Sequence, residues 1–379
     1  MINRIPLFLF CFAISSNCFS QDPALVFYTA KDLQIGGRAE VIESNPFTRI
    51  DSVQAASLPL RMQQLAGNTS GLYLEFESDA SSLYLQWELD EYRVLWNMTP
   101  LAVNGFDLYG WTGSRWQYMA SAKPSGTLNS GKLIGNLDGN SRQYRLYFPL
   151  YSGLQQLKLG VEASATIHLT QNLPPASAKV LIYGSSITQG ASASRPGMAF
   201  PAIIARELNL EMLNFGFSGS GKMELEMAEI LGSISSDLII LDCVPNPSAE
   251  EIRQRTLPFV QRLRELQPDT PILMVESIFR ENGYWDQKLH NRVESQNRAF
   301  RKAWEQLEKV GYKNLFYLSN EYLIGNDHEA TIDGVHLSDL GHFRMAQELG
   351  RVIRQVLNIP SSGNGASETS LENNKITKP

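Results

Sequence analysis

The chain has 379 residues, of which 43% are hydrophobic and 19% are charged. This length suits two domains, and the composition excludes a disordered or fibrous chain. The formal net charge of −6 disfavours nucleic acid or an anionic membrane surface as a partner, because both require a basic protein surface.

The N-terminus has the pattern of a secretory signal peptide. Arg4 supplies a positive charge, residues 5–14 form a short apolar run, and Cys18 and Ser20 place small residues near a cleavage point. The run is shorter than the roughly 20 residues that cross a bilayer. We therefore expect a signal peptide over residues 1–20 and a secreted or periplasmic protein without membrane insertion. A lipid anchor is the less favoured alternative, because the residues before Cys18 fit a lipobox poorly.

Cleavage of the signal peptide would remove two of the three cysteines and bring the net charge close to −7. Cys243 would then stand alone, so the mature chain is expected to contain no internal disulfide. Its place in the apolar run 238–244 favours a buried structural thiol over a nucleophile.

Residues 22–172 consist of short apolar or alternating segments separated by Gly, Asn, Ser and Asp. The clearest segments are 72–77, 82–89, 143–148 and 154–161. Because no long helical pattern interrupts them, they predict an antiparallel β-sandwich or jelly roll. Four tryptophans fall in this half, and a place in the sandwich core is favoured for them over stacking on sugar rings. They are Trp87, Trp96, Trp111 and Trp116.

The pattern changes after a short proline-containing linker at residues 172–178. Strands and helices then alternate over residues 179–358, which predicts an α/β domain with a parallel sheet and helices on both faces. The predicted strands are 179–183, 211–215, 237–243, 271–275 and 313–318, and the predicted helices are about 198–208, 222–233, 248–266, 287–310 and 339–357. Residues 360–379, rich in Ser, Gly, Asn and Thr, are expected to be disordered.

Ser186 is a candidate nucleophile in the segment Gly-Ser-Ser-Ile-Thr-Gln-Gly at 184–190. It follows the first strand of the α/β half and is therefore expected at the carboxyl edge of the sheet, where such folds bind ligands. Read alone, the segment is equally well explained as a turn in which Ser or Thr caps the next helix.

Asp333 and His336 lie three residues apart, just before the last predicted helix. A serine hydroxyl becomes a good nucleophile when a histidine takes its proton and a carboxylate orients that histidine. In isolation, the pair fits an Asp turn followed by a surface histidine better.

Two further loops contain donors that suit an oxyanion. The segment 215–221 (Phe-Gly-Phe-Ser-Gly-Ser-Gly) follows the second strand, and its glycines let a backbone N–H approach a substrate. The segment 244–247 (Val-Pro-Asn-Pro) follows the third strand, where two prolines stiffen the backbone around Asn246. Taken singly, each is better explained as an ordinary loop between a strand and a helix.

The order of these four segments resembles the SGNH or GDSL-type hydrolase family from about residue 179 to 357. The resemblance implies a flavodoxin-like three-layer α/β domain after the sandwich. It assigns catalytic roles to Ser186, Asp333 and His336, and an oxyanion hole to Ser186, Gly219 and Asn246. The chain departs from the family pattern at two places, because Ser185 replaces the usual Asp and Val244 replaces a usual Gly.

The N-terminal half resembles the β-sandwich that precedes some bacterial SGNH esterases, through segments 96–100, 105–109 and 144–151. Analogy with carbohydrate acetylesterases then implies a secreted serine esterase that deacetylates a carbohydrate through an acyl-enzyme. A lysophospholipase- or thioesterase-like hydrolase, acyl transfer to another sugar, and a non-catalytic carbohydrate-binding protein are the alternatives.

Other candidate residues are set aside. His328 follows Asp327 in a polar loop ahead of the Asp333 segment, and His342 is expected to pack or cap on the last helix. Glu276 and Arg280 follow the fourth strand and are expected near the cleft without an assigned role. No metal-binding or dinucleotide pattern is present, so no cofactor or metal is expected. The sequence does not address the oligomeric state.

Overall fold

The computed structural model describes residues 24–39, 45–171 and 173–360. The predicted signal peptide, with Cys11 and Cys18, and residues 361–379 of the predicted tail lie outside the described residues. No helix within the described ranges is long and apolar enough to cross a membrane.

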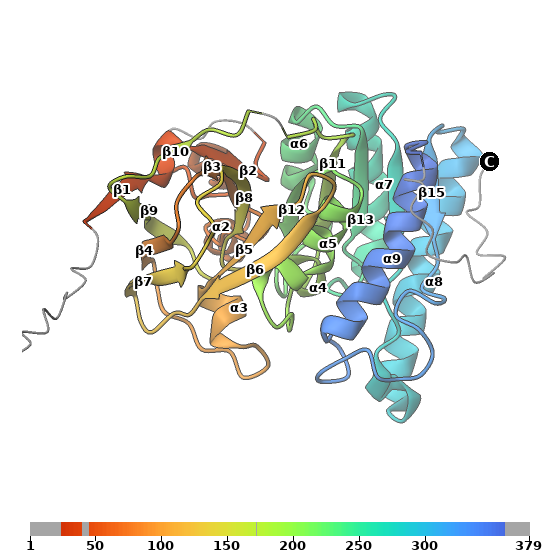
Figure 1. Ribbon diagram of the computed structural model, residues 1–379. Coiled ribbons are helices and arrows are strands. Elements are labelled where there is room, and N and C mark those ends of the chain that lie inside the picture. The colour runs from red at the N-terminus through yellow and green to blue at the C-terminus, as the bar shows by residue number, and fades with distance from the viewer. Residues whose placement is uncertain (1–23, 40–44, 172, 361–379) are drawn as a thin grey trace, which may run out of the picture.

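The N-terminal half forms two antiparallel sheets, which confirms the predicted sandwich (Figure 1). One sheet has the order β1 (Leu25–Thr29), β9 (Leu154–Glu162), β4 (Leu83–Leu89) and β7 (Leu128–Ile134). The other has the order β10 (Ile167–His168), β3 (Tyr73–Ser78), β8 (Arg142–Tyr147), β5 (Phe106–Trp111) and β6 (Trp116–Ala122), with β2 (Gln34–Gly36) beside β3. Every second residue of β4 is buried between the sheets, as the alternating sequence predicts.

The C-terminal half is built on a parallel five-stranded sheet. Its order is β12 (Glu211–Gly216), β11 (Lys179–Gly184), β13 (Leu238–Asp242), β14 (Ile272–Val275) and β15 (Leu315–Leu318). This order, 2-1-3-4-5 by position along the chain, is that of the flavodoxin-like folds and confirms the predicted fold class. The carboxyl ends of all five strands therefore meet at one edge of the sheet.

Helices cover both faces of this sheet and bury it. One face packs against α5 (Phe200–Glu207) and α9 (Asp339–Val356), and the other packs against α6 (Leu225–Ser233), α7 (Ala249–Leu266) and α8 (Gln287–Val310). In β11, Val180 and Ile182 face the first group, whereas Leu181 and Tyr183 face the second. Burial on both faces explains why these strands are continuous apolar runs in the sequence.

The two halves share buried contacts. The short helices α1 (Ser52–Ala55) and α2 (Leu60–Ala66) come from the N-terminal half, but their apolar side chains join the core of the parallel sheet. Arg49, which is 1% exposed, donates to the carbonyls of Asn214 and Gly216 at 3.0 and 2.8 Å. The halves therefore form one continuous body rather than two modules joined only by a linker.

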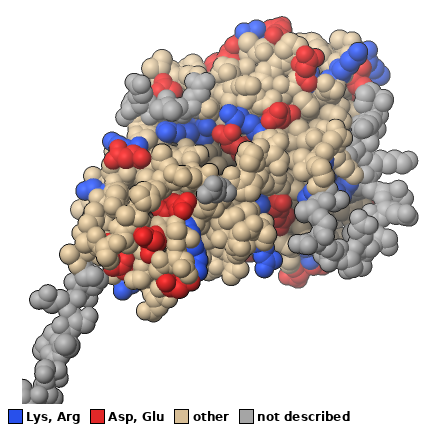
Figure 2. Space-filling view, turned by 45° about the horizontal axis from the view of Figure 1, so that its top comes forward, with Lys and Arg blue, Asp and Glu red and all other residues tan. Residues whose placement is uncertain are grey.

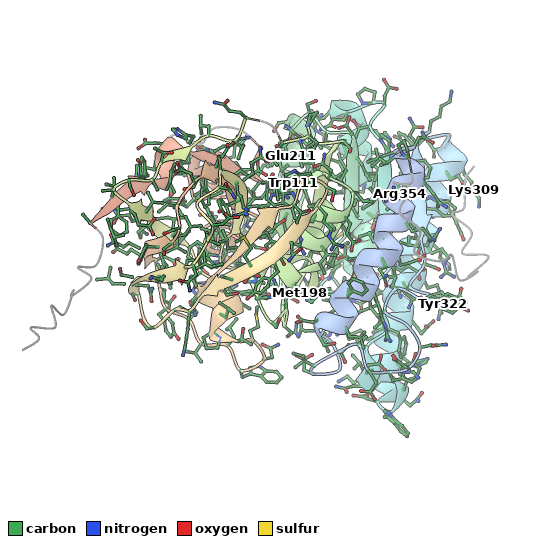
Figure 3. All side chains as sticks on the ribbon, viewed as in Figure 1. Trp111, Met198, Glu211, Lys309, Tyr322 and Arg354 are labelled. Carbon is green, nitrogen blue, oxygen red and sulfur yellow. The ribbon has the colours of Figure 1, made fainter. Side chains whose placement is uncertain are left out.

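A second contact between the halves surrounds Asp107 of β5. Its carboxylate accepts hydrogen bonds from the Arg195 side chain and the Gly197 N–H, both at 2.9 Å. Gly197 belongs to the 3-10 helix η2 (Pro196–Met198), and Figure 3 labels Met198 at this part of the interface. Farther along the interface, Trp111 of the sandwich and Glu211 of β12 line one cavity of about 340 Å³ (Figure 3).

Candidate active site

Three predicted residues form a hydrogen-bonded chain at the carboxyl edge of the parallel sheet. The Oγ atom of Ser186 lies 3.0 Å from Nε2 of His336, and Nδ1 of His336 lies 2.7 Å from Oδ2 of Asp333. Ser186 is 9% exposed, whereas a quarter of the His336 side chain is open to solvent. Solvent therefore reaches the point where the serine and the histidine meet.

Two adjacent serines in the turn after β11 make different contacts. Ser185 caps α4 (Ser186–Gln189), because its hydroxyl accepts the N–H of Ile187 at 3.2 Å. Ser186 is the first residue of that helix, and its side chain faces His336. One serine therefore caps the helix while its neighbour faces His336. Ser185, the capping residue, stands at the position where the hydrolases that this sequence resembles usually have Asp.

A tight turn presents Asp333 and His336. The N–H of Ile332 donates to the carbonyl of His336 at 2.9 Å, and Oδ1 of Asp333 accepts the N–H groups of Val335 and His336 at 3.0 and 2.7 Å. Burial alone raises the pKa of the Asp333 carboxyl, but the bonds from His336 and from Asn97 outweigh it and hold that pKa below its ordinary value. Asp333 is therefore a carboxylate at neutral pH.

Gly219 occupies a turn that only glycine adopts easily. The N–H of Ser220 donates to the carbonyl of Phe217 at 2.9 Å, and Gly219 between them has a φ of 69°. Gly219 is exposed, and a Cβ atom added to it would meet open space. Within the described part of the chain, its N–H has no hydrogen-bond acceptor. This donor and the N–H of Ser186, which lies at a helix N-terminus, remain available to a ligand.

The structure places Asn246 beside the same turn. Its side-chain nitrogen donates to the carbonyl of Ser220 and, at 3.4 Å, to that of Phe217. Its loop is braced from behind by Arg280, which donates to the carbonyl of Pro245 at 2.7 Å. Asn246 and Gly219 are thus brought together, and in this arrangement the amide of Asn246 holds the turn that carries Gly219.

Several other residues singled out in the sequence have structural partners. Val244 and Cys243 are fully buried, and burial raises the pKa of the Cys243 thiol far above its ordinary value. Glu276 is fully buried and accepts hydrogen bonds from Arg301, Tyr317 and the N–H of Asn320. Arg280 braces the loop of Asn246, as described above, so neither Glu276 nor Arg280 takes part in the hydrogen-bonded chain of Ser186.

The two set-aside histidines also lie outside that chain. His328 pairs with Glu281 at 2.8 Å on the exposed side of the Asp333 turn. His342 is fully buried, and this burial lowers its pKa to about 4. Its Nδ1 accepts the N–H of Phe200, and its Nε2 lies 3.0 Å from the carbonyl of Ala191.

The sequence reasoning missed one residue that touches this site. Asn97, in the sandwich, donates from Nδ2 to Oδ2 of Asp333 at 3.0 Å and lies 3.4 Å from Nδ1 of His336. In the sequence, the segment 96–100 shows only a resemblance to other sandwiches and the tryptophan Trp96. No spacing rule identifies a contact between residues 236 positions apart.

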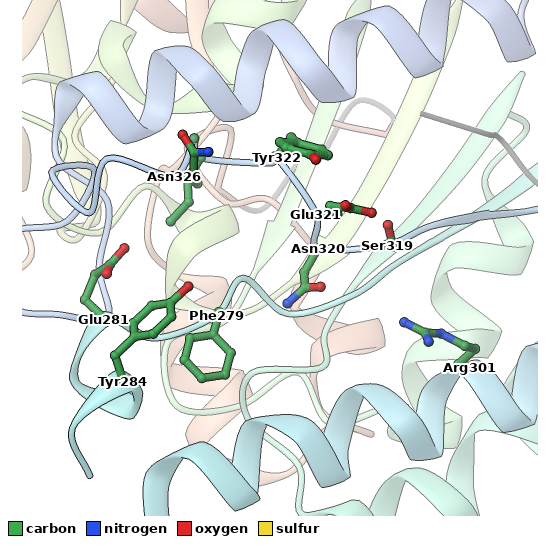
Figure 4. Close-up of a pocket in the computed structure, with 11 residues that line it drawn as sticks. Phe279, Glu281, Tyr284, Arg301, Ser319, Asn320, Glu321, Tyr322 and Asn326 are labelled. Atoms are coloured by element: carbon green, nitrogen blue, oxygen red, sulfur yellow. The ribbon is translucent and has the colours of Figure 1, made fainter. Parts of the chain in front are cut away.

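Two hollows flank the site. One, of about 400 Å³, lies at the ends of β14 and β15, where Figure 4 shows the rings of Phe279 and Tyr284 side by side. It touches the Asp333 turn through Glu281, whose N–H donates to the carbonyl of Gly334 at 2.8 Å. The other, of about 700 Å³, begins at Gly219 and extends between α2 and α7. Among the described residues, no cluster of His, Cys, Asp or Glu is arranged to hold a metal ion.

Comparison with known families gives two matches that together span most of the chain. Residues 177–354 match the GDSL-like lipase/acylhydrolase family, and residues 25–167 match the N-terminal domain of SGNH hydrolase-type esterases. The second family is named for the motif Gly-x-Asp-Leu-Tyr, which stands here at 105–109 and contains the interface residue Asp107. Proteins with curated descriptions gave no match.

Solved structures match over nearly the whole chain. A crystal structure assigned as a GDSL-like lipase from Bacteroides ovatus is 38% identical, with a TM-score of 0.86, and covers 89% of this chain and 99% of its own. A salicylyl-acyltransferase from a tetracycline biosynthetic pathway is 21% identical, with a TM-score of 0.69, over 90% and 98% of the two chains. A family two carbohydrate esterase from Cellvibrio japonicus is 14% identical, with a TM-score of 0.60, over 89% and 99%.

Proposed function

Because the chain belongs to the GDSL-like lipase/acylhydrolase family of SGNH esterases, we propose that it cleaves a carboxylic ester with Ser186 as the nucleophile. The observation that carries the proposal is the continuous chain from Ser186 through His336 to Asp333, with distances of 3.0 and 2.7 Å. Both distances lie within the range that proton transfer and orientation of the base require.

The mechanism follows from this chain. Nδ1 of His336 carries a proton, because it faces the Asp333 carboxylate, so the free electron pair of Nε2 faces Ser186. Nε2 takes the serine proton as Oγ attacks the ester carbonyl. The resulting imidazolium is stabilised by Asp333 and then protonates the leaving alcohol. Water then attacks the acyl carbonyl and gives a proton to the same nitrogen. The bond to Oγ breaks, the acid leaves, and the imidazolium returns its proton to Oγ of Ser186.

The negative oxygen of the tetrahedral intermediate requires fixed donors. We assign the N–H groups of Ser186 and Gly219 to this role, because neither has an acceptor within the described residues and the first lies at a helix N-terminus. We assign Asn246 as the third donor. Its contact with the Phe217 carbonyl is long at 3.4 Å, so the oxyanion can replace that carbonyl as the acceptor.

We propose an acetylated carbohydrate as the substrate. The fold-level likeness to the Cellvibrio japonicus carbohydrate esterase supports this class, as does the exposed ring of Trp96 next to Asn97. Trp87 lies in the sandwich core, as expected. Trp116 is buried outside that core, in a cluster that includes Ala202 of α5, and Trp111 packs against it. Trp96 is 84% exposed, so the expectation of a core position is wrong for it. Acidic and basic side chains are intermixed on the face in Figure 2, which suits a neutral polymer. The signal-peptide pattern would deliver such an enzyme to extracellular glycans.

The direct test replaces the nucleophile. Ser186→Ala is expected to lower turnover of p-nitrophenyl acetate by at least about 10³-fold, because no other group in the chain of hydrogen bonds can form the acyl-enzyme. Ser233→Ala, at an exposed serine near the end of α6, is the matched control and should keep full activity. Equal turnover by Ser186→Ala and the wild type would refute the proposal.

Two further measurements separate the alternatives. A fluorophosphonate probe should label the wild-type protein at Ser186, and failure to label would indicate a non-catalytic binding protein. Acetate release from acetylated polysaccharides should exceed cleavage of long-chain esters. A preference for chains of eight or more carbons would instead indicate a lysophospholipase-like enzyme.

A further inference from the structure

We infer that Asn97 of the β-sandwich is a positioning residue for the triad, so that the active site is completed by the N-terminal half of the chain. The inference rests on the proposed esterase function. It concerns a side chain that the four sequence blocks of the C-terminal half do not contain. Asn97 lies between β4 and the short helix α3 (Pro100–Asn104).

Asn97 contacts the same oxygen of Asp333 that faces the imidazole of His336. Oδ2 of Asp333 accepts from His336 Nδ1 at 2.7 Å and from Asn97 Nδ2 at 3.0 Å. The other carboxylate oxygen is already fixed by two backbone N–H groups. Asn97 therefore supplies the fourth donor and prevents the carboxylate from rotating about its last bond. A carboxylate held in this way keeps the plane of the imidazole fixed toward Ser186.

The loop that carries Asn97 is fastened at both of its ends. On the sandwich side, the buried side chain of Asn104 exchanges hydrogen bonds with the backbone N–H and carbonyl of Arg93 at 3.0 and 2.8 Å. On the hydrolase side, the hydroxyl of Thr99 donates to the carbonyl of Ser194 at 2.6 Å. The position of Asn97 is thus set before substrate arrives.

Ser194 links this loop to the helix that follows the catalytic histidine. Its N–H and its hydroxyl donate to the two carboxylate oxygens of Asp339, at 2.8 and 2.5 Å. Asp339 is the first residue of α9, three positions after His336. The sandwich loop is therefore connected to the His336 segment twice, once through Asn97 and once through Thr99 and Ser194.

The chemistry of the amide explains why asparagine serves this position. Nδ2 can only donate, so the 3.4 Å approach of Asn97 to Nδ1 of His336 cannot replace Asp333 as the acceptor of the imidazole proton. The proton stays on the Asp333 side, and the electron pair of Nε2 stays on the Ser186 side. The amide also places the partial positive charge of its N–H groups 3.4 Å from Nδ1 of His336.

The experiment compares Asn97→Ala and Asn97→Asp with the wild type on glycerol triacetate. A hydrogen bond to a charged group contributes about 1.5–3 kcal/mol, so we expect kcat of Asn97→Ala to fall by roughly 10- to 100-fold with KM little changed. The acid limb of the pH profile should move to higher pH, because the partial positive charge near the imidazole is lost. Asn97→Asp should move it further, since a second carboxylate faces His336.

A double-mutant cycle distinguishes a positioning role of Asn97 from a merely structural one. In an Asp333→Ala background the acceptor is absent, so Asn97→Ala should cost almost nothing more if it acts through Asp333. The exposed Asn140→Ala variant is the matched control and should behave like the wild type. An unchanged kcat and pH profile for Asn97→Ala, or an equal loss in both backgrounds, would overturn the inference.

A measurement that needs no substrate tests the positioning role of Asn97 separately from the proposed esterase function. The imidazole N–H that faces Asp333 should give a strongly downfield proton resonance in the wild type. Asn97→Ala should shift or broaden this resonance, whereas Asn140→Ala should not. If the wild type showed the resonance but cleaved no ester, the proposed function alone would fail. If Asn97→Ala left the resonance unchanged, the positioning role would fail.

Discussion

His342 is a histidine that the structure keeps neutral. Burial lowers its pKa to about 4, and both ring nitrogens have backbone partners. Because an unfolded histidine has a pKa near 6.5, the unfolded chain binds more protons than the native one between these values. The stabilisation from the neutral ring is therefore complete above pH ~6.5 and is lost as the pH falls toward 4.

His342→Gln should make the protein less sensitive to acid. The free energy of unfolding of the wild type is expected to fall relative to the variant, by at most about 1.4 kcal/mol per pH unit, as the pH is lowered from 6.5 to 4. Urea unfolding of both proteins at several pH values measures this difference. His168→Gln, at an exposed histidine of β10, is the matched control for the loss of an imidazole. A constant difference between wild type and His342→Gln across this range would contradict the assignment.

Asn246→Ala tests the third oxyanion donor. Loss of one such donor typically lowers kcat by about 10²–10³-fold with little effect on KM, because the bond strengthens only in the transition state. Steady-state kinetics with p-nitrophenyl acetate give both constants. Asn246 also holds the Phe217–Ser220 turn. A variant that loses thermal stability while kcat is retained would show that holding the turn is its whole role.

The loop between β4 and α3 carries two neighbouring side chains with different surroundings. Asn97 faces Asp333, whereas the ring of Trp96 is exposed to solvent beside it. We propose that this exposed ring stacks on a sugar ring of a bound glycan. The same loop would then orient the base and hold the substrate.

Trp96→Ala should raise KM for an acetylated oligosaccharide about tenfold, because loss of a stacking contact of about 1–1.5 kcal/mol weakens binding by that factor. Hydrolysis of glycerol triacetate, which has no ring, should be unchanged. Leu128→Ala removes an exposed apolar side chain of β7 and is the control. Equal KM values for the oligosaccharide in Trp96→Ala and the wild type would exclude this surface as a sugar site.

Elements with a strong local signal could be predicted from the sequence. The strand expected at 179–183 is β11 (Lys179–Gly184), and the helix expected at 287–310 is α8 (Gln287–Val310), because burial imposes a regular apolar pattern on each. Asp333 and His336 were found because they lie in one turn. The sequence alone could not show whether Ser186 is a nucleophile or a helix cap. In the structure the neighbouring Ser185 is the cap.

Contacts between distant segments could not be predicted in this way. The sequence predicts only sandwich strands over residues 22–172, yet α1 and α2 form there and their side chains join the core of the parallel sheet. The approach of Asn97 to Asp333 likewise depends on how the two halves dock. A periodic pattern reports which face of an element is buried, but not which partner buries it.

At the scale of the whole molecule, Asp107 fastens the sandwich to the hydrolase half. It is fully buried and binds Arg195 and the N–H of Gly197 across the interface. Removing the Asp107 carboxylate leaves the buried N–H of Gly197 without its acceptor and costs Arg195 its ion pair, although Arg195 is 21% exposed and also donates to Tyr109. Such a loss typically costs about 1–3 kcal/mol. Because the halves share buried contacts, we expect this cost to appear in a single unfolding transition.

Asp107→Ala is therefore expected to lower the thermal unfolding midpoint of the whole chain in one step, as followed by circular dichroism or calorimetry. Asp138→Ala is the matched control, because Asp138 pairs with Arg142 on the surface of the same sandwich. An exposed pair contributes at most about 1 kcal/mol, so the control should unfold almost like the wild type. Two separate transitions in the wild type would contradict the view of one cooperative body.

The contact between Asn97 and Asp333 also bears on how such a protein can change through evolution. A gene rearrangement that exchanged the sandwich for another module would discard the side chain that donates to Asp333 and that we infer orients His336. The two halves are therefore expected to be inherited as a pair and to diverge together. The match to the Bacteroides ovatus structure, over 89% of this chain and 99% of its own, is what such joint inheritance produces. An engineer who wants a smaller esterase from this chain would have to rebuild a donor to Asp333 within the hydrolase half.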